Sequence, residues 1–192
     1  PPKIPGKQER IFDTTLLING LPVIQIEEKR DTRDVDEALN QMHQYIDENQ
    51  YSDIFSTLQI LVAITPNNVK YMANTTAERF NRDFAFHWQR KSDNRVVRNW
   101  KEFADSMLSI PMAHQMATNF MILDGTPNKQ SVKVMRPYQV YATQRAIGAI
   151  KHADFDCPID GRKLGYIWHT TGSGKTIPSF KTAWLASRLP GV

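Results

Sequence analysis

The sequence has very little cysteine: Cys157 is the only one in 192 residues. A single cysteine excludes a disulfide within the chain and fits a reducing compartment, so we expect a cytoplasmic location and interpret Cys157 as an ordinary loop thiol. Runs of about 18 apolar residues are also missing, and the N-terminus lacks the pattern of a signal peptide. These absences exclude a membrane-spanning helix.

An initiator methionine, internal repeats and low-complexity tracts are missing as well. The chain starts at Pro1 and stops soon after a strong motif described below, so we expect it to be a piece of a longer protein. The net charge of +4 is too mild to identify a nucleic-acid binder. The length allows one large domain or two small ones with a sizeable core.

The stretch Phe12–Arg30 organises the rest of the chain. Within it, Asn19-Gly20 separates two short apolar runs, Thr14–Ile18 and Leu21–Ile26. Asn-Gly between strand-like runs predicts a hairpin, because both residues tolerate positive φ. The runs carry consecutive apolar residues, which predicts strands that are covered on both faces.

Charged residues stand at both ends of this hairpin. Asp13 precedes the first strand, and Glu27, Glu28 and Lys29 close the second. One interpretation is a solvated hairpin end. The other is a metal-dependent nuclease, in which two carboxylates hold Mg²⁺ and a lysine orients water or stabilises charge on the phosphate.

Side chains alternate between the two faces of a strand, and this parity makes the nuclease interpretation testable. A regular two-residue turn would pair Asp13 with Ile26, and Glu27 would then point to the other face of the sheet. A shared metal ion therefore requires one extra residue in the register, from a three-residue loop or from a bulge near Asp13 or Pro22. We expect the two carboxylates to converge within about 4–5 Å.

Hydrophobic periodicity and turn residues predict the remaining elements. They are a helix over Val35–Glu48 with Asp34 as N-cap, strands over Leu58–Thr65 and Val69–Thr75, helices over Arg95–Leu108, Met112–Phe120, Pro137–Lys151 and Ser179–Leu189, a polar loop over Ala153–Arg162, and a short strand over Gly165–His169. The order strand, strand, helix, strand, strand predicts a mixed α/β domain with a central sheet. Asp124–Asn128 is interpreted as a linker between two domains.

The segment Arg79–Lys101 is basic and rich in aromatic residues, with seven Lys or Arg against two Asp. Such a segment can follow a nucleic-acid backbone and stack bases. The alternative is a solvated face whose aromatic side chains point into the core. We favour the core for the aromatic residues and leave both interpretations open for the arginines.

A glycine-rich turn follows the predicted strand at Gly165–His169. It reads Thr170-Thr171-Gly172-Ser173-Gly174-Lys175-Thr176 and leads into an amphipathic run. This is the context of a P-loop, in which glycines turn backbone N–H groups toward phosphates at a helix N-terminus. Lys175 would neutralise the β- and γ-phosphates, and the Thr176 hydroxyl would be a Mg²⁺ ligand. The first glycine of the strict pattern is replaced by His169.

A hairpin of this kind upstream of a P-loop resembles the restriction (motor and endonuclease) subunit of type I restriction-modification enzymes. The resemblance runs through nearly the whole chain. It is carried by Asn19-Gly-Leu-Pro-Val-Ile-Gln-Ile-Glu, Ala73-Asn-Thr-Thr, Lys91-Ser-Asp-Asn, Val134-Met-Arg-Pro-Tyr-Gln and Gly165-Tyr-Ile-Trp-His-Thr-Thr-Gly-Ser-Gly-Lys-Thr.

The resemblance implies roles for individual residues. Asp13, Glu27 and Lys29 match the catalytic Asp…Glu-x-Lys motif, with Asp13 and Glu27 as metal ligands. Gln41 and Tyr45 match a Gln-x-x-x-Tyr motif that supports the active site and contacts DNA. By spacing alone, these two would be a solvated helix face.

ATP-binding roles follow in the same way. Gln139 matches the adenine-reading glutamine that precedes the first motor motif of superfamily 2 translocases, and Thr171, Gly172, Ser173, Gly174, Lys175 and Thr176 match that motif. Thr176 would also be a metal ligand. The implied cofactors are Mg²⁺ and ATP.

The implied architecture is a mixed-sheet PD-(D/E)xK endonuclease domain over residues 1–127, followed by the beginning of a RecA-like translocase lobe over residues 128–192. The implied function is ATP-dependent translocation of double-stranded DNA and Mg²⁺-dependent cleavage away from the recognition site. Methyltransferase and specificity subunits are the implied partners, and no membrane is.

Departures from the family pattern limit the transfer. Helices upstream of Asp13, with an acidic residue near the metal, and the acidic motif that follows the P-loop are missing, so we expect the fragment alone to be inactive. Asp31 also places an acid beside the site. Two alternatives stay open: a nuclease-helicase of a DNA repair system, and a non-catalytic DNA-binding or docking fragment.

Overall fold

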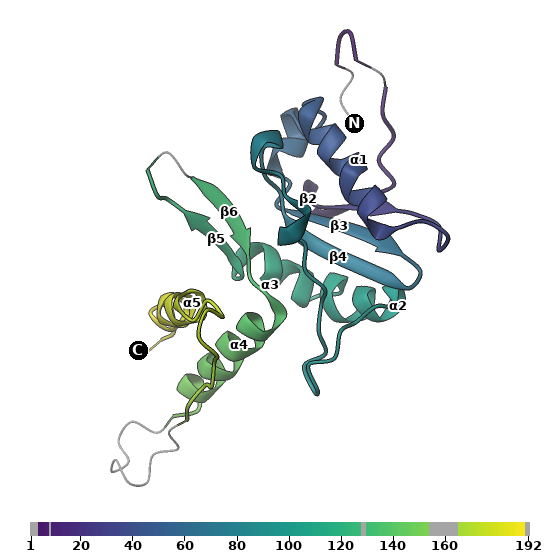
Figure 1. The fold of residues 1–192 in the computed structure, drawn as a ribbon. Coiled ribbons are helices and arrows are strands. Elements are labelled where there is room, and N and C mark those ends of the chain that lie inside the picture. The colour runs from purple at the N-terminus through teal and green to yellow at the C-terminus, as the bar shows by residue number, and fades with distance from the viewer. Residues whose placement is uncertain (1–3, 8, 128–129, 154–164, 191–192) are drawn as a thin grey trace. The chain divides into compact units, whose positions relative to one another are not determined.

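The computed structural model describes residues 4–7, 9–127, 130–153 and 165–190, which form two compact units, Pro1–Val134 and Met135–Val192. Figure 1 labels most of their helices and strands. The first unit contains β1 (Thr14–Ile18), β2 (Leu21–Glu28), α1 (Val35–Asp47), β3 (Ile60–Thr65), β4 (Asn68–Ala73), α2 (Trp100–Phe103), α3 (Met112–Thr118), β5 (Met121–Asp124) and β6 (Ser131–Val134). Short helical turns are η1 (Asp53–Thr57), η2 (Ala77–Arg79), η3 (Arg82–Phe84) and the π-helical η4 (Ala104–Leu108). The second unit contains α4 (Pro137–Lys151) and α5 (Thr176–Ala186).

The core of the first unit is a mixed four-stranded sheet in the order β1-β2-β3-β4. Neighbours β1 and β2 are antiparallel, β2 and β3 are parallel, and β3 and β4 are antiparallel. The predicted order of elements and the mixed sheet are therefore confirmed. The helix α1 connects the two parallel strands, and its N-cap is Asp34 as predicted, with the carboxylate accepting a 2.9 Å hydrogen bond from Asp36 N.

The β1–β2 hairpin has the predicted two-residue turn, because Asn19 and Gly20 both have positive φ, at 51° and 82°. Its register changes between Leu16 and Leu17, which leaves Val23 as an extra residue on β2. Burial differs between the two strands: the interior of β2 is buried throughout, whereas β1 is an edge strand and Leu17 is 55% exposed. The prediction of coverage on both faces was right for β2 and wrong for β1.

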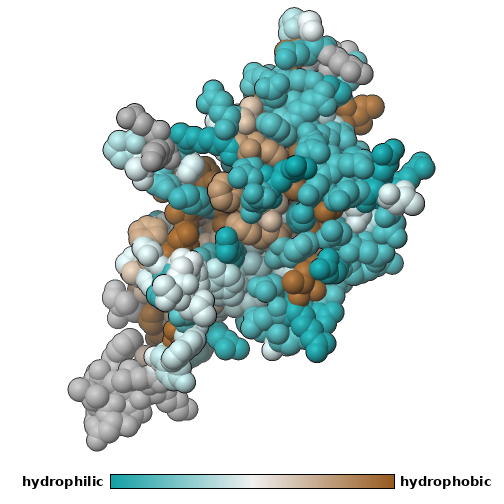
Figure 2. Space-filling view, viewed as in Figure 1, coloured by the Kyte–Doolittle hydropathy of each residue, from teal (hydrophilic) through white to brown (hydrophobic). Residues whose placement is uncertain are grey.

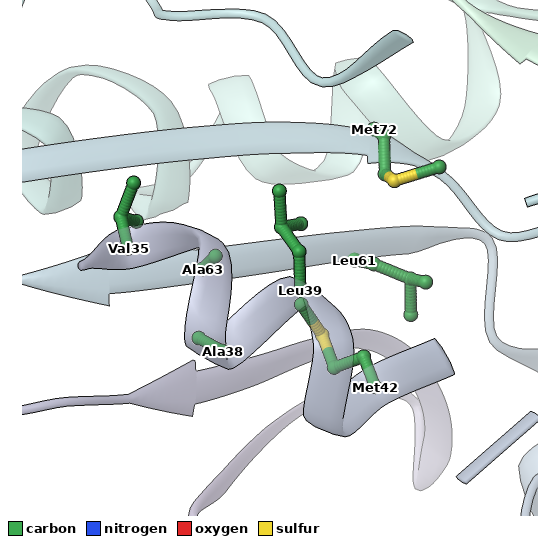
Figure 3. Packing of buried hydrophobic residues seen from close by; sticks show 7 residues of the cluster. All are labelled: Val35, Ala38, Leu39, Met42, Leu61, Ala63 and Met72. Carbon is green, nitrogen blue, oxygen red and sulfur yellow. The ribbon is translucent and has the colours of Figure 1, made fainter. Parts of the chain in front are cut away.

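One face of the sheet is covered by α1. Four α1 residues spaced along one stripe pack on β3 and β4 in the cluster drawn in Figure 3: Val35, Ala38, Leu39 and Met42 against Leu61, Ala63 and Met72. Leu39 is fully buried at its centre. Truncating such a leucine to alanine costs about 2–5 kcal/mol of unfolding free energy.

The other face of the sheet packs on the segment after β4. The ring of Tyr71 on β4 lies 5.9 Å from that of the fully buried Trp88. The core interpretation of the aromatic residues is thus right for Trp88, whereas Phe84 and Trp100 are 59% and 42% exposed. The helix predicted from Arg95 begins only at Trp100, because Val96 forms a β-bridge with Gln89.

The stretch interpreted as a linker is instead part of a hairpin. Asp124 pairs with Ser131 in a two-stranded sheet of β5 and β6, so residues 125–130 connect its strands. Asp, Gly and Pro mark a tight turn as well as a linker, and the sequence pattern does not separate the two. The compact units divide between Val134 and Met135 instead of between residues 127 and 128.

In the second unit α4 has the predicted bounds, and α5 begins three residues before the predicted Ser179. The strand predicted over Gly165–His169 is not formed: these residues are irregular, since the described part of this unit contains no strand with which they can pair. Cys157 and all but the first residue of the predicted polar loop lie outside the described residues. No helix in the described ranges combines the length and the apolar character needed to cross a bilayer.

Candidate functional site

The bulge at Val23 decides where the charged hairpin residues point. Thr14 pairs with Ile26, so the same register places Asp13 opposite Glu27, and residues opposite each other share a face. The predicted one-residue change of register, with a bulge beside Pro22, is confirmed. Without Val23, Asp13 would lie opposite Ile26 and away from Glu27.

The register between β2 and β3 also shows which face of the sheet carries Asp13 and Glu27. Glu27 lies beside Ala63 in the parallel β2–β3 register, and Ala63 belongs to the cluster under α1. Glu27 is therefore on the α1 face. The next pair on that face is polar as well, since Thr15 donates a 2.7 Å hydrogen bond to the Gln25 side chain.

Glu27 is fully buried at the end of its strand. Burial is the main cause that raises its pKa from 4.5 to about 7; the neighbouring Asp13 carboxylate raises it further, and a 3.0 Å ion pair with Lys29 opposes the rise. The second carboxylate oxygen, Oε2, is buried and has no hydrogen-bond partner within the described residues. A buried, unsatisfied carboxylate oxygen next to a second carboxylate is a fitting ligand for a cation.

Asp13 is held in place by its backbone surroundings. Its Oδ2 accepts a 2.8 Å hydrogen bond from Glu28 N across the hairpin. Asp13 itself is exposed, so the pair of carboxylates opens to solvent on the Asp13 side. Within the described part of the chain, no group of three or more His, Cys, Asp or Glu residues is arranged to hold a metal ion.

The helix α1 brings Gln41 and Tyr45 to this site. The Gln41 amide donates a hydrogen bond to the Tyr45 hydroxyl, which donates a 3.3 Å bond to the Ile11 carbonyl, two residues before Asp13. Burial raises the pKa of Tyr45, the Gln41 bond lowers it, and the negative charges of Glu27 and Asp13 raise it further. Gln41 and Tyr45 are therefore neighbours of the carboxylates and not a solvated face.

Two further contacts fix the segment before Asp13, and sequence patterns did not reveal them. Arg10 forms a bidentate ion pair with Glu48 at the end of α1, in which Arg10 Nε lies 2.8 Å from Glu48 Oε2. The ring of Phe12 lies 5.2 Å from that of Tyr45 and 5.0 Å from that of Phe55. Helical spacing from Tyr45 could have pointed to Glu48, but nothing local pairs it with Arg10.

Tyr51 is another neighbour of the site, and no sequence pattern points to it. Its ring lies 5.4 Å from Phe12, and its hydroxyl is buried with no hydrogen-bond partner within the described residues. Burial, followed by the charge of Glu27, raises its pKa. The site thus contains two unsatisfied buried oxygens, one on Tyr51 and one on Glu27.

The second candidate site is the glycine-rich loop before α5. Gly172 and Gly174 have positive φ, at 78° and 74°, as the predicted turn requires. Ser173 closes the turn with a 2.7 Å bond from its hydroxyl to the Thr170 carbonyl. Residues Thr171, Gly172, Gly174, Lys175 and Thr176 are exposed, and Thr176 begins the helix.

Gln139 lies against this loop. Its side-chain oxygen accepts a 3.0 Å bond from Arg136 N, and its amide nitrogen donates to the carbonyls of Ser173 and Gly174 at 3.4 and 3.2 Å. The Tyr138 hydroxyl also donates to the Ser173 carbonyl, at 2.8 Å. The structure therefore brings Gln139, largely buried in the first turn of α4, against the loop.

Two family models match the chain. Residues 2–80 match the family described as type I restriction enzyme R protein N terminus, and residues 138–190 match the SWI2/SNF2 ATPase family. The first match contains the carboxylate pair, and the second contains the glycine-rich loop. Together they make the chain similar to the N-terminal region of a type I restriction enzyme R protein and, further along, to an ATPase family.

Curated relatives name the family. The chain is 36% identical to the type I restriction enzyme SsaAORF53P endonuclease subunit of Staphylococcus saprophyticus, over 92% of this chain and 18% of that protein. It is 36% identical to the EcoprrI endonuclease subunit of Escherichia coli, over 76% of this chain and 46% of that protein. A putative MjaVIIIP endonuclease subunit of Methanocaldococcus jannaschii is 25% identical over 91% of this chain. The chain belongs to the family of type I restriction enzyme endonuclease subunits, and it spans about a fifth to a half of the length of these relatives.

Proposed function

We propose that the first unit is the PD-(D/E)xK nuclease centre of a type I restriction enzyme and that the second unit begins its RecA-like ATP-driven motor. In the complete enzyme the motor would pull in double-stranded DNA, and the nuclease would cut it away from the recognition site. Methyltransferase and specificity subunits would supply sequence recognition. The observation that carries the proposal is the bulged register that brings Asp13 opposite Glu27, whose buried Oε2 has no hydrogen-bond partner among the described residues.

Each residue of the nuclease centre has a separate role. Asp13 and Glu27 would hold Mg²⁺, which when bound supplies Lewis-acid activation of the scissile phosphate and of water. Lys29, 3.0 Å from Glu27, would orient the attacking water or stabilise charge that develops on the phosphate. Gln41 and Tyr45 would fix the backbone before Asp13 and contact DNA.

The glycine-rich loop would hold the phosphates of ATP. Gly172, Gly174 and the start of α5 supply the turn and the helix N-terminus, Lys175 would neutralise the phosphates, and Thr176 would bind Mg²⁺. Gln139 would support the loop through its two carbonyl contacts as well as read adenine.

The test separates the two centres in the full-length subunit. Alanine at Asp13, Glu27 or Lys29 should reduce double-strand cleavage at least about 10²- to 10⁴-fold and leave DNA-stimulated ATPase largely intact. Lys175→Ala should remove ATP-driven translocation, and cleavage should fail with it. If ATPase activity fell in parallel with cleavage in the Asp13 and Glu27 variants, these residues would be structural.

A non-catalytic DNA-binding or docking role has one observation in its favour: no three-ligand metal cluster occurs within the described residues. Calorimetric titration of the chain with Mn²⁺ at millimolar concentration distinguishes the two. Heat that disappears in Glu27→Gln supports the nuclease centre, whereas no heat in the unaltered chain supports docking. A nuclease-helicase of a DNA repair system would be purified without methyltransferase subunits, whereas a type I restriction subunit would copurify with them.

A further inference from the structure

The end of the sheet that carries Asp13 and Glu27 also includes the β3–β4 turn. Because β2 and β3 are parallel, their C-terminal ends lie side by side, and Lys29 N donates a 2.8 Å bond to the Ile64 carbonyl there. The turn itself is tied to the chain after β2, since Asn67 donates a 3.0 Å bond to Asp31. The carboxylate pair and this turn therefore share one edge of the domain.

The start of α2 reaches the same turn. Trp100 N donates a 3.3 Å bond to the Pro66 carbonyl. Arg98 follows Val97, whose backbone N donates a 2.9 Å bond to the Trp88 carbonyl. Residues 98–101 are thus placed at the edge that carries the carboxylate pair.

Ion pairing divides the basic residues of this segment into two groups. Arg90 binds Glu102, with Nη2 to Oε2 at 2.8 Å, and Arg95 lies 3.5 Å from Asp93. In contrast, no carboxylate in the described part of the chain pairs with Arg98 or Lys101, and both are exposed. These two cations are free to bind another molecule.

An exposed aromatic ring and a third cation complete the surface. Trp100 is 42% exposed, and Lys101 Nζ lies 5.7 Å from the centre of its ring. Arg30, directly after Lys29, is exposed and has no acidic partner within the described ranges. We call Arg30, Arg98, Trp100 and Lys101 the cationic edge. Most of the visible surface of this unit is hydrophilic (Figure 2).

The spacing fits a nucleic-acid backbone. Neighbouring strands lie about 4.8 Å apart, so the distance from β2 to β4, with β3 between them, is about 10 Å. B-DNA has one phosphate per about 3.4 Å of axis on each strand, so about three base-pair steps span this distance. A duplex whose phosphate lies at Asp13 and Glu27 on the α1 face, and that runs across this end of the sheet, therefore passes the β3–β4 turn, to which Trp100 N is bonded from the other face.

We propose that the cationic edge binds the backbone of the duplex that the carboxylate pair cuts. This inference rests on the proposed nuclease function, because the carboxylates fix where the duplex lies. Duplex DNA is favoured over an acidic protein because cations without a carboxylate partner in the described residues stand beside an exposed tryptophan, whose ring can pack on a sugar of the backbone.

The test measures binding of a fluorescent 20-base-pair duplex by anisotropy between roughly 25 and 200 mM salt, with Ca²⁺ in place of Mg²⁺. The slope of log K against log salt is negative, and each lost phosphate contact makes it shallower by about 0.9. The double variant R98Q/K101Q should therefore make it shallower by about 1.8 on any DNA sequence. Trp100→Ala should weaken binding and leave the slope unchanged. The control is Lys133→Gln on β6, toward the opposite end of the sheet. Lys133 is an exposed cation that is ion-paired with Asp124 at 2.5 Å, and its loss should change neither the affinity nor the slope.

The outcomes separate the two proposals. An unchanged slope in R98Q/K101Q, when the unaltered chain binds, overturns the cationic edge and leaves the nuclease centre in place. No salt-dependent binding by the unaltered chain overturns both. If poly-glutamate competes as strongly as the duplex, charge for charge, the edge is a site for acidic proteins and the assignment to DNA is wrong.

Discussion

Replacing Glu27 by glutamine tests the buried carboxylate with almost no change in size. The pKa of Glu27 rises from 4.5 to about 7 on folding, so the folded chain holds this proton more tightly than the unfolded chain. At about 1.4 kcal/mol per pH unit, the ionised carboxylate costs the folded chain about 3 kcal/mol of unfolding free energy. Glutamine resembles the protonated acid and does not bear this cost.

The sign of the pH dependence follows from the direction of the shift. Below about pH 4.5 the carboxyl group is protonated in both states and there is no cost. Between about pH 4.5 and 7 the unfolded chain releases the proton and the folded chain keeps it, so the free energy of unfolding falls as the pH rises. Above about pH 7 the fall is complete.

Denaturant titrations at a series of pH values between 5 and 8.5, without divalent metal, measure this fall. The unaltered chain should lose about 2–3 kcal/mol over this range, and Glu27→Gln should lose much less. Glu28→Gln is the matched control, because Glu28 is exposed on the opposite face of the same strand. Identical pH profiles for the unaltered chain and Glu27→Gln would refute the buried, unsatisfied carboxylate.

Other predictions concern single contacts. Tyr51→Phe should raise the free energy of unfolding by about 1 kcal/mol, since it removes a buried hydroxyl that has no partner among the described residues. A loss of stability in denaturant titration would show that the hydroxyl is bonded. Gly174→Ala should lower the melting temperature more than Gly172→Ala, because both have positive φ but only at Gly174 does a Cβ meet Gln139, at 2.9 Å. Combining each glycine variant with Gln139→Ala should remove the difference in melting temperature. If Gly174→Ala and Gly172→Ala lower the melting temperature equally while Gln139 is present, the contact between position 174 and Gln139 is wrong. Lys175→Ala should weaken binding of a fluorescent ATP analogue with no change in melting temperature, because Lys175 is exposed.

The sequence predicted the elements of the first sheet and the one-residue change of register in its hairpin. Asn19-Gly20 sets the turn, and parity then required one extra residue if Asp13 and Glu27 were to share a face. Parity could not say which residue is extra. That depends on how the whole of β2 packs, and the extra residue is Val23, beside the proline that lacks a ladder donor.

Hydrophobic periodicity cannot predict contacts between residues that are far apart in the sequence. Arg10 and Glu48 are 38 residues apart, and no local rule joins them. The late start of α2 has the same origin, since Val96 is held by Gln89 in a bridge that replaces a helical conformation. Gly165–His169 has a strand-like sequence, but a strand forms only beside a partner.

Because of the bulge at Val23, Asp13 and Glu27 share a face only if the number of residues between them stays even or odd as it is now. Deleting one codon between Asp13 and Glu27 would send the two carboxylates to opposite sides of the sheet, even if every remaining side chain were kept. Deleting two codons, one from each strand, would shorten the hairpin and keep the carboxylates together. Substitutions and length changes therefore affect this hairpin differently: over these residues, an odd change in length is the mutation that the proposed activity tolerates least.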